Sequence, residues 1–72
     1  MLDIYEIRFM HRTWDGEVKS GEVRLFGMTI RVVKNYAKRL ERDGHWNVTI
    51  WKASVKLGFG DGSEIEKYTQ VN

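Results

Sequence analysis

The segment TIRVVKNYAKRLERDG, residues 29–44, decides how this 72-residue chain folds, because its apolar residues recur at helical spacing. At about 100° per residue, the large apolar side chains fall within one arc. Thr29 is placed to cap the helix through its hydroxyl, and Gly44 to end it in the left-handed conformation. The segment therefore predicts one amphipathic helix, whose buried face consists of Ile30, Val33, Tyr36, Ala37 and Leu40.

The same segment carries the positive charge of the chain. Five cations against Glu41 and Asp43 give it a net charge of +3, whereas the whole chain has a net charge of +2. These cations gather opposite or beside the apolar arc and form a basic ridge, which is a candidate binding surface for an acidic partner. A solvated helix face is the simpler interpretation of the same charges. The ridge consists of Arg31, Lys34, Lys38, Arg39 and Arg42.

Two Asp-Gly pairs flank the helical segment, at Asp15-Gly16 and Asp61-Gly62. Asp-Gly between alternating segments is a strong hairpin signal, because glycine tolerates the positive φ that tight turns need. The sequence therefore predicts one hairpin on each side of the helix. The resulting ββαββ order indicates an α+β fold, a four-stranded antiparallel sheet with the amphipathic helix packed on one face. Residues 1–72 form a single domain, and a right-handed crossover gives the strand order 2-1-3-4.

In the first hairpin, the shortest turn would put the apolar residues of the second strand on the wrong face of the sheet. Tyr5, Ile7 and Phe9 alternate with charged residues and are expected to face the core. A two-residue turn at Asp15-Gly16 would place Glu22 opposite Phe9, on the buried face. One extra residue near Ser20-Gly21, with Gly21 at positive φ in a bulge, would return Val23 and Leu25 to the core. A longer loop that closes at Lys19-Ser20-Gly21 is the alternative.

The second hairpin begins at Trp46, and its apolar pattern changes phase. Val48 and Ile50 alternate with polar residues, but from Trp51 onward the apolar residues occupy the other positions. Either a bulge lies near Lys52-Ala53, or the strand is apolar on both faces. The last segment, residues 65–71, is rich in charge and is predicted to be an edge strand.

One helix covers only one face of such a sheet, so the other face is expected to be open. That face should present Met10 together with a second set of candidate partner- or nucleic-acid-binding residues, and Trp14 is a further candidate for it. Because this face would expose apolar surface, we expect a partner or a second copy of the chain to cover it. The candidate binding residues of this face are Arg8, Arg12, Arg24 and Trp51.

Size and composition exclude several protein classes. A domain of this size buries only about 60% of the surface of its unfolded chain, so its stability is marginal. The chain has no cysteine, which excludes disulfides and thiolate metal sites, and its 42% hydrophobic content is that of a folded domain. The acidic N-terminus does not resemble a signal peptide, and no apolar run is long enough to span a membrane. A soluble cytoplasmic protein is expected.

The sequence shows no enzymatic chemistry. His11 and His45 lie far apart with no aspartate at triad-like spacing, and the serines have no recognisable base. No ligand spacing indicates a metal site. The glycines at 58, 60 and 62 are followed by a predicted strand, whereas a phosphate loop needs a helix there. We expect no enzyme, no metal, no cofactor and no small-molecule substrate.

These observations favour a non-enzymatic binding module. A tiny α+β domain without catalytic residues is similar in general character to accessory proteins of phages and mobile elements, a likeness that involves no particular residues. The leading hypothesis is a small regulator or inhibitor, of phage or mobile-element origin, that docks on a host protein complex handling nucleic acid. The alternatives are direct nucleic-acid binding and a homodimeric structural subunit. Trp14, Trp46 and Trp51 fit either core packing or interface anchoring.

Overall fold

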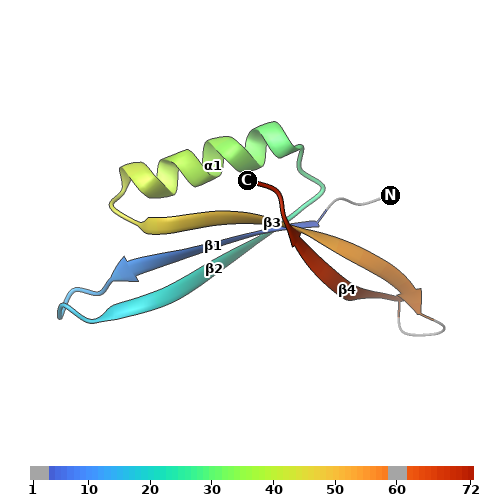
Figure 1. Cartoon of the computed structure of the whole chain (residues 1–72), viewed down its shortest axis with the longest axis horizontal. Helices are drawn as coiled ribbons and strands as arrows, with labels where there is room; N and C mark the ends of the chain where they lie inside the picture. The colour runs from blue at the N-terminus through green and yellow to red at the C-terminus, as the bar shows by residue number, and fades with distance from the viewer. Residues whose placement is uncertain (1–3, 59–61) are drawn as a thin grey trace.

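A β-hairpin, one helix and a second β-hairpin follow one another along the chain (Figure 1). The computed structural model describes residues 4–58 and 62–72, and only the backbone of residues 54–58 and 62–66. The predicted α+β fold with the order ββαββ is confirmed. The elements are β1 (Ile4–Arg12), β2 (Val18–Phe26), α1 (Ile30–Arg42), β3 (Trp46–Gly58) and β4 (Gly62–Gln70).

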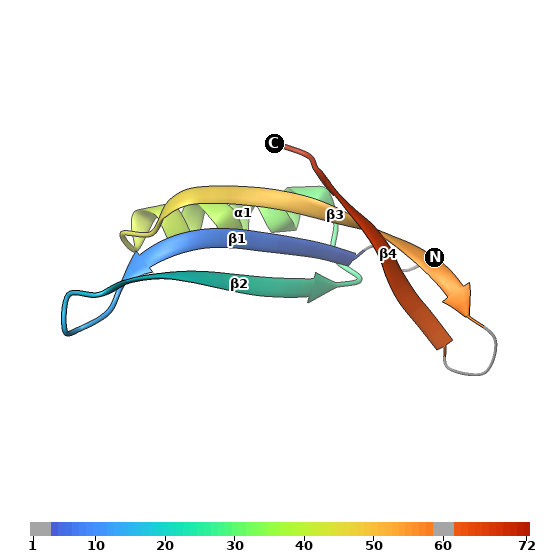
Figure 2. The ribbon, with the colours of Figure 1, turned by 60° about the horizontal axis from the view of Figure 1, so that its bottom comes forward.

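The four strands form one open antiparallel sheet in the order β2-β1-β3-β4, as predicted. α1 lies on one side of this sheet, mainly over β3 and β1, and we call this side the helix side and the opposite one the far side. Figure 2 views the far side, with α1 behind the sheet and β2 and β3 running in the same direction. Seen from the helix side with both strands pointing up, β3 lies to the right of β2, so the crossover through α1 is right-handed.

The core lies between α1 and the strands beneath it. Tyr5 and Ile7 of β1 face the helix, as predicted, and Ile7 is fully buried. α1 contributes Val33 and Ala37, which lie one turn apart, and β3 contributes Ile50. Ile30 and Tyr36, which the sequence pattern placed on the buried face, are exposed, because α1 lies mainly over β3 and β1 and the sheet covers only the centre of the apolar arc. Half-buried apolar side chains surround this cluster, and they are Phe9, Leu25, Leu40 and Val48.

Both ends of α1 have the predicted caps. The Thr29 hydroxyl accepts a hydrogen bond from the backbone N–H of Val32 (3.4 Å). At the other end, Gly44 has φ +98°, and its N–H donates to the carbonyl of Glu41 (3.1 Å). The N–H of His45 donates to the carbonyl of Leu40 (3.1 Å), which completes a Schellman motif. The helix boundaries thus follow from local hydrogen bonding alone.

In the first hairpin, the extra residue that the sequence pattern requires lies in the turn. The prediction of a bulge at Gly21 is therefore wrong. Thr13 and Glu17 close a loop of three residues, in which the N–H of Gly16 donates to the carbonyl of Thr13 (3.0 Å) and Gly16 has φ +88°. The odd loop length shifts the register by the one residue that the sequence pattern demands. As predicted, Val23 and Leu25 lie on the core face, opposite Ile7 and Tyr5.

Gly21 has a different role, in a regular part of β2 opposite Phe9. A Cβ atom built on Gly21 would lie 2.6 Å from the Cε2 and Cζ atoms of the Phe9 ring. The ring therefore covers the glycine across the two strands, and the small residue is needed for this close approach rather than for its backbone freedom. The alternative of a loop closing at Lys19-Ser20-Gly21 is also wrong, because these residues pair with β1.

As far as Ala53, β3 carries apolar residues on both of its faces. This agrees with the second of the two predicted alternatives. Residues 50–53 pair with β1 in unbroken register, so no bulge lies near Lys52-Ala53 in that ladder. The register shifts earlier, where Asn47 has φ +52°, and the β3–β4 ladder shifts between Ser54 and Val55. Ile50 therefore faces the helix side, while Trp51 and Ala53 share the far side with Glu6 and Ile4.

The β3–β4 hairpin bends away from the α1 layer, so the far side is concave at this end (Figure 1). Tyr68 of β4 pairs with Ala53, which in turn pairs with Ile4. Ile4 and Ala53 are both buried. β4 is an edge strand, as predicted, but it spans Gly62–Gln70 rather than residues 65–71. The predicted turn at Asp61-Gly62 falls partly on residues 59–61, which lie outside the described residues.

Candidate functional site

The outer side of α1 carries the ridge. All five of its side chains are exposed, and none forms an ion pair within residues 4–58 and 62–72 as far as their side chains are described. Arg31, Lys38 and Arg42 lie within about 40° of one another around the helix axis. Arg39 and Arg42 also lie in the last turn, where cations interact favourably with the negative end of the helix dipole. The ridge is a convex cationic surface about 17 Å long.

The cations of the far side are arranged around a buried carboxylate. Glu6 is only 2% exposed, and its carboxylate accepts a hydrogen bond from Arg8 Nε (2.6 Å) and a longer one from Arg24 Nη2 (3.4 Å). Arg8 is two residues away on β1, and Arg24 lies directly opposite Glu6 on β2. Because a buried carboxylate needs compensating charge, these two guanidinium groups have a structural role.

Arg8 also stacks between two aromatic rings. Its guanidinium carbon lies 4.5 Å from the ring centroid of Trp51 and 5.2 Å from that of Tyr68. The indole N–H of Trp51 donates to the Thr49 hydroxyl (2.9 Å), which fixes the ring on the sheet. The Tyr68 hydroxyl is buried without a hydrogen-bond partner among the described residues. The Arg8 guanidinium therefore contacts both rings, which reduces the ring surface on which nucleic-acid bases could stack.

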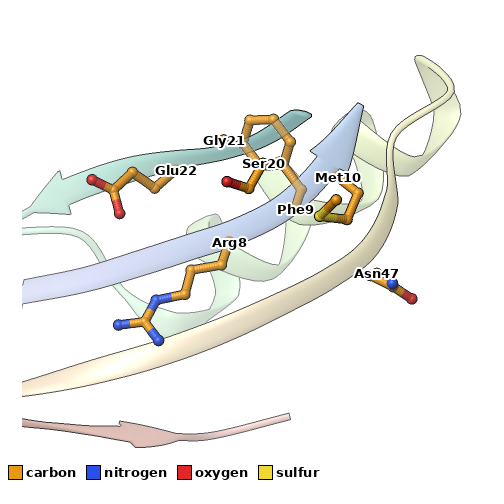
Figure 3. A pocket seen from close by; sticks show the side chains of 7 residues that line it. All are labelled: Arg8, Phe9, Met10, Ser20, Gly21, Glu22 and Asn47. Carbon is orange, nitrogen blue, oxygen red and sulfur yellow. The ribbon is translucent and has the colours of Figure 1, made fainter. Parts of the chain in front are cut away.

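A shallow groove of about 580 Å³ lies beside this cluster on the far side (Figure 3). Figure 3 shows Glu22 and Arg8 toward one end of the groove and Met10 and Asn47 toward the other. Phe9, Ser20 and Gly21 complete the lining. One cation, one anion and an amide spread along an open groove do not converge on one point, as a small-molecule site requires. The groove has no clear preference for a ligand charge.

The remaining candidates lie at the hairpin tip and in strand β3. Arg12 donates to the carbonyl of Gly16 (3.3 Å), so it supports the first turn. Trp14, a candidate for the far side from the sequence pattern, lies instead in that turn, beyond the last paired residues of β1 and β2, and is 99% exposed. Trp46 is exposed at the start of β3, whereas Trp51 lies half-buried on the far side, as expected.

The fold brings together two histidines that are 34 positions apart in the sequence. The rings of His11 and His45 have centroids 5.9 Å apart, and the Phe9 ring contacts His45 edge-on at 4.9 Å. Nδ1 of His45 lies 3.0 Å from the carbonyl oxygen of Leu40 and extends the helix cap. Within the described part of the chain, no group of three histidine, cysteine or acidic side chains is placed to hold a metal ion.

Sequence reasoning missed two residues of the far-side cluster, Glu6 and Tyr68. The spacing of Glu6 and Arg8 places both on one face of a strand, and this was visible in the sequence. The burial of Glu6 also depends on Arg24 and Trp51, which only the strand register brings opposite to it. Tyr68 reaches Arg8 because the β3–β4 hairpin bends, and no local signal indicates that bend.

Comparison with known proteins adds no relative. No family model matches the chain, and no curated protein and no solved structure is significantly similar to it. Within the described residues, the structure has no helix of the length and apolarity that crossing a membrane requires.

Proposed function

We propose that this chain is a small binding module without catalytic activity, which uses the ridge of α1 to dock on an acidic surface of a partner protein. A regulator or inhibitor of a larger complex is the biological role that such a module fits. The proposal depends on one observation: the ridge cations are exposed and free of ion pairs in the described structure, whereas Arg8 and Arg24 on the sheet are held by Glu6.

The ridge suits a protein partner better than a nucleic acid. Glu41 and Asp43 lie in or next to the last turn of the same helix and reduce its net charge. Binding to single-stranded nucleic acid usually combines a basic groove with aromatic rings on which bases stack. Here the Trp51 and Tyr68 rings already contact Arg8 and lie on the other side of the sheet from the ridge. Direct nucleic-acid binding is therefore the alternative outcome of the test.

The test reverses the ridge charge. The variant R31E/K38E/R42E changes only exposed side chains, but it places an anion at the negative end of the helix dipole, so its unfolding free energy should fall by about 1 kcal/mol and the variant should remain folded. The matched control K19E/K52E/K67E produces the same change in net charge at exposed lysines outside the ridge. Fluorescence anisotropy with labelled poly-glutamate should show binding by the parent and the control and none by the ridge variant. Equal loss in both variants would mean that net charge, not the ridge, is responsible.

A salt titration separates the two classes of partner. The same three proteins are titrated with single-stranded and duplex DNA between about 50 and 200 mM salt. Direct phosphate contacts make the affinity fall steeply with salt, in proportion to the number of phosphates neutralised. We expect only weak DNA binding at the lower salt concentration. Tight DNA binding that is lost in the ridge variant would replace the protein-docking proposal with the nucleic-acid one.

A further inference from the structure

We infer that two copies of this chain pair through their β2 edges as a twofold dimer, with Val23 at the symmetry axis. This inference goes beyond the ridge proposal and does not need an acidic partner. β2 is a nine-residue edge strand, paired on one side with β1 and on its other side with no strand of the described sheet. Three observations select a second copy as the occupant: hydrogen-bond parity, charge and the adjoining apolar surface.

Hydrogen-bond parity defines which residues of β2 are available. The N–H of Thr13 donates to the carbonyl of Glu17 (2.8 Å), so this pair begins the β1–β2 ladder as a hydrogen-bonded pair. Because such pairs alternate along antiparallel strands, the odd residues of β2 direct their backbone groups toward β1. The even residues direct theirs outward. A second strand must therefore pair even residues with even residues, as a twofold axis through any single residue of β2 does.

The charged side chains of β2 then favour one of the registers that have a twofold axis through a single residue. An axis at Glu22 places two Glu22 carboxylates opposite each other, and an axis at Arg24 does the same with two guanidinium groups. An axis at Gly21 pairs neither charge. An axis at Val23 places Glu22 of each copy opposite Arg24 of the other, which gives two ion pairs on the far side.

The charges of these two residues fit that arrangement. Glu22 is exposed and has no ion pair within the part of the chain whose side chains are described. Arg24 has 44% of its side chain exposed and makes only a long contact of 3.4 Å with Glu6. An arginine has five N–H donors, so Arg24 can hold Glu6 of its own chain and Glu22 of the second copy.

Apolar residues complete the interface on the helix side. With the axis at Val23, the two Val23 side chains lie opposite each other and Leu25 lies opposite Gly21 of the second copy. The right-handed crossover places the flank of α1 that carries Val32 and Tyr36 toward β2. These two side chains are 45% and 36% exposed, so this flank of α1 presents apolar surface on the side from which the second copy approaches.

The dimer has a geometric consequence for the ridge. A twofold axis that pairs antiparallel edge strands runs perpendicular to the sheet, so both copies of α1 lie on the same side of one continuous sheet. Two basic ridges would then face the same partner surface.

Cysteine cross-linking tests the register directly, because the chain contains no cysteine of its own. The single variants E22C, V23C and R24C are oxidised, and covalent dimers are separated on non-reducing gels. At Val23 the Cα atoms across the axis form a non-hydrogen-bonded pair about 4.5 Å apart, close enough for a disulfide. We expect a covalent dimer for V23C and little for the two neighbours. A dominant cross-link at position 22 or 24, or none at all, would overturn the register.

Sedimentation velocity of the unmodified chain tests the dimer itself, from about 1 to 100 μM. The parent should sediment as a dimer, and E22K should raise the dissociation constant at least about tenfold because it replaces two attractive contacts with repulsive ones. E41K, with the same charge change on α1, is the control and should sediment like the parent. A parent that is monomeric throughout, or a dimer unaffected by E22K, would overturn the proposal.

Discussion

The sheet and the helix both carry candidate cations, but only those of the sheet are paired with a buried carboxylate. Arg8 and Arg24 on the far side surround the buried Glu6, whereas Arg31 and the other ridge side chains point into solvent without a described ion pair. A sequence presents both groups as candidates for binding an acidic partner. The difference shows that a carboxylate supplied by the fold takes up part of the bonding capacity of a cation, so that the ridge cations remain fully available to a partner and the sheet cations only in part.

The largest effect is expected at Glu6. Glu6→Gln keeps the size of the side chain but removes the charge that Arg8 and Arg24 neutralise, while leaving a polar group buried. Because both arginines are about half exposed and regain water, the loss of unfolding free energy should be about 2 kcal/mol, below the 3–5 kcal/mol typical of fully buried pairs. Thermal unfolding should show a melting temperature roughly 10 °C lower. The matched control is Glu41→Gln on α1, and equal melting temperatures for the two variants would abolish the distinction between the two regions.

A pair of arginine variants sharpens the same comparison. Arg8→Gln removes the shorter contact to Glu6 and the stacking on Trp51, so it should cost about 1–2 kcal/mol of unfolding free energy. Arg31→Gln removes an exposed charge and should change the unfolding free energy by less than about 0.5 kcal/mol. Urea denaturation measures both. If Arg31→Gln were as destabilising as Arg8→Gln, the ridge would have a structural role that its exposure does not show.

The smallest effect concerns Asp15, an acidic residue fully exposed in the first turn. The hydrogen bond from the Thr13 hydroxyl, with a further one from the Glu17 N–H, lowers the pKa of Asp15 below its ordinary value. The stabilisation is therefore present above about pH 4 and is lost as the pH falls through the lower, folded-state pKa. Asp15→Asn should remove a small part of the acid dependence of the melting temperature. Parallel profiles for parent and variant below pH 4 would contradict this.

The helix and its ends could be read from the sequence because their determinants are local. The apolar arc, the Thr29 cap and the Gly44 terminator all lie within the sixteen residues 29–44. Both caps are found as predicted, and Val33 and Ala37 at the centre of the arc are buried, whereas Ile30 and Tyr36 at its margins are exposed. The helical period alone also places the ridge on the outer side. The alternation of Tyr5 and Ile7 likewise identified the face of β1 that packs against α1, although Ile4 and Glu6 on the other face are buried as well.

The register of the first hairpin could be predicted only in part. The sequence pattern demanded one extra residue and a glycine at positive φ, and both are present, but in the turn at Gly16 rather than at Gly21. Gly16 and Gly21 satisfy the parity argument equally well. What separates them is the Phe9 ring lying over Gly21, a contact between strands that local patterns do not encode.

The sequence by itself determined the element order, the helix caps and the position of the ridge, because these follow from residue periodicity and from hydrogen bonds between near neighbours. The strand order followed from the element order together with the right-handed crossover rule. Only the tertiary structure decided which cations remain free. Glu6 becomes buried because the strand register places Arg24 on one side of it and Trp51 on the other. Tyr68 joins the cluster because the β3–β4 hairpin bends toward the far side. Such contacts depend on packing between segments that are distant in the sequence. A carboxylate can bind a cation, and so make it less available to a partner, only when the fold has brought the two side chains together.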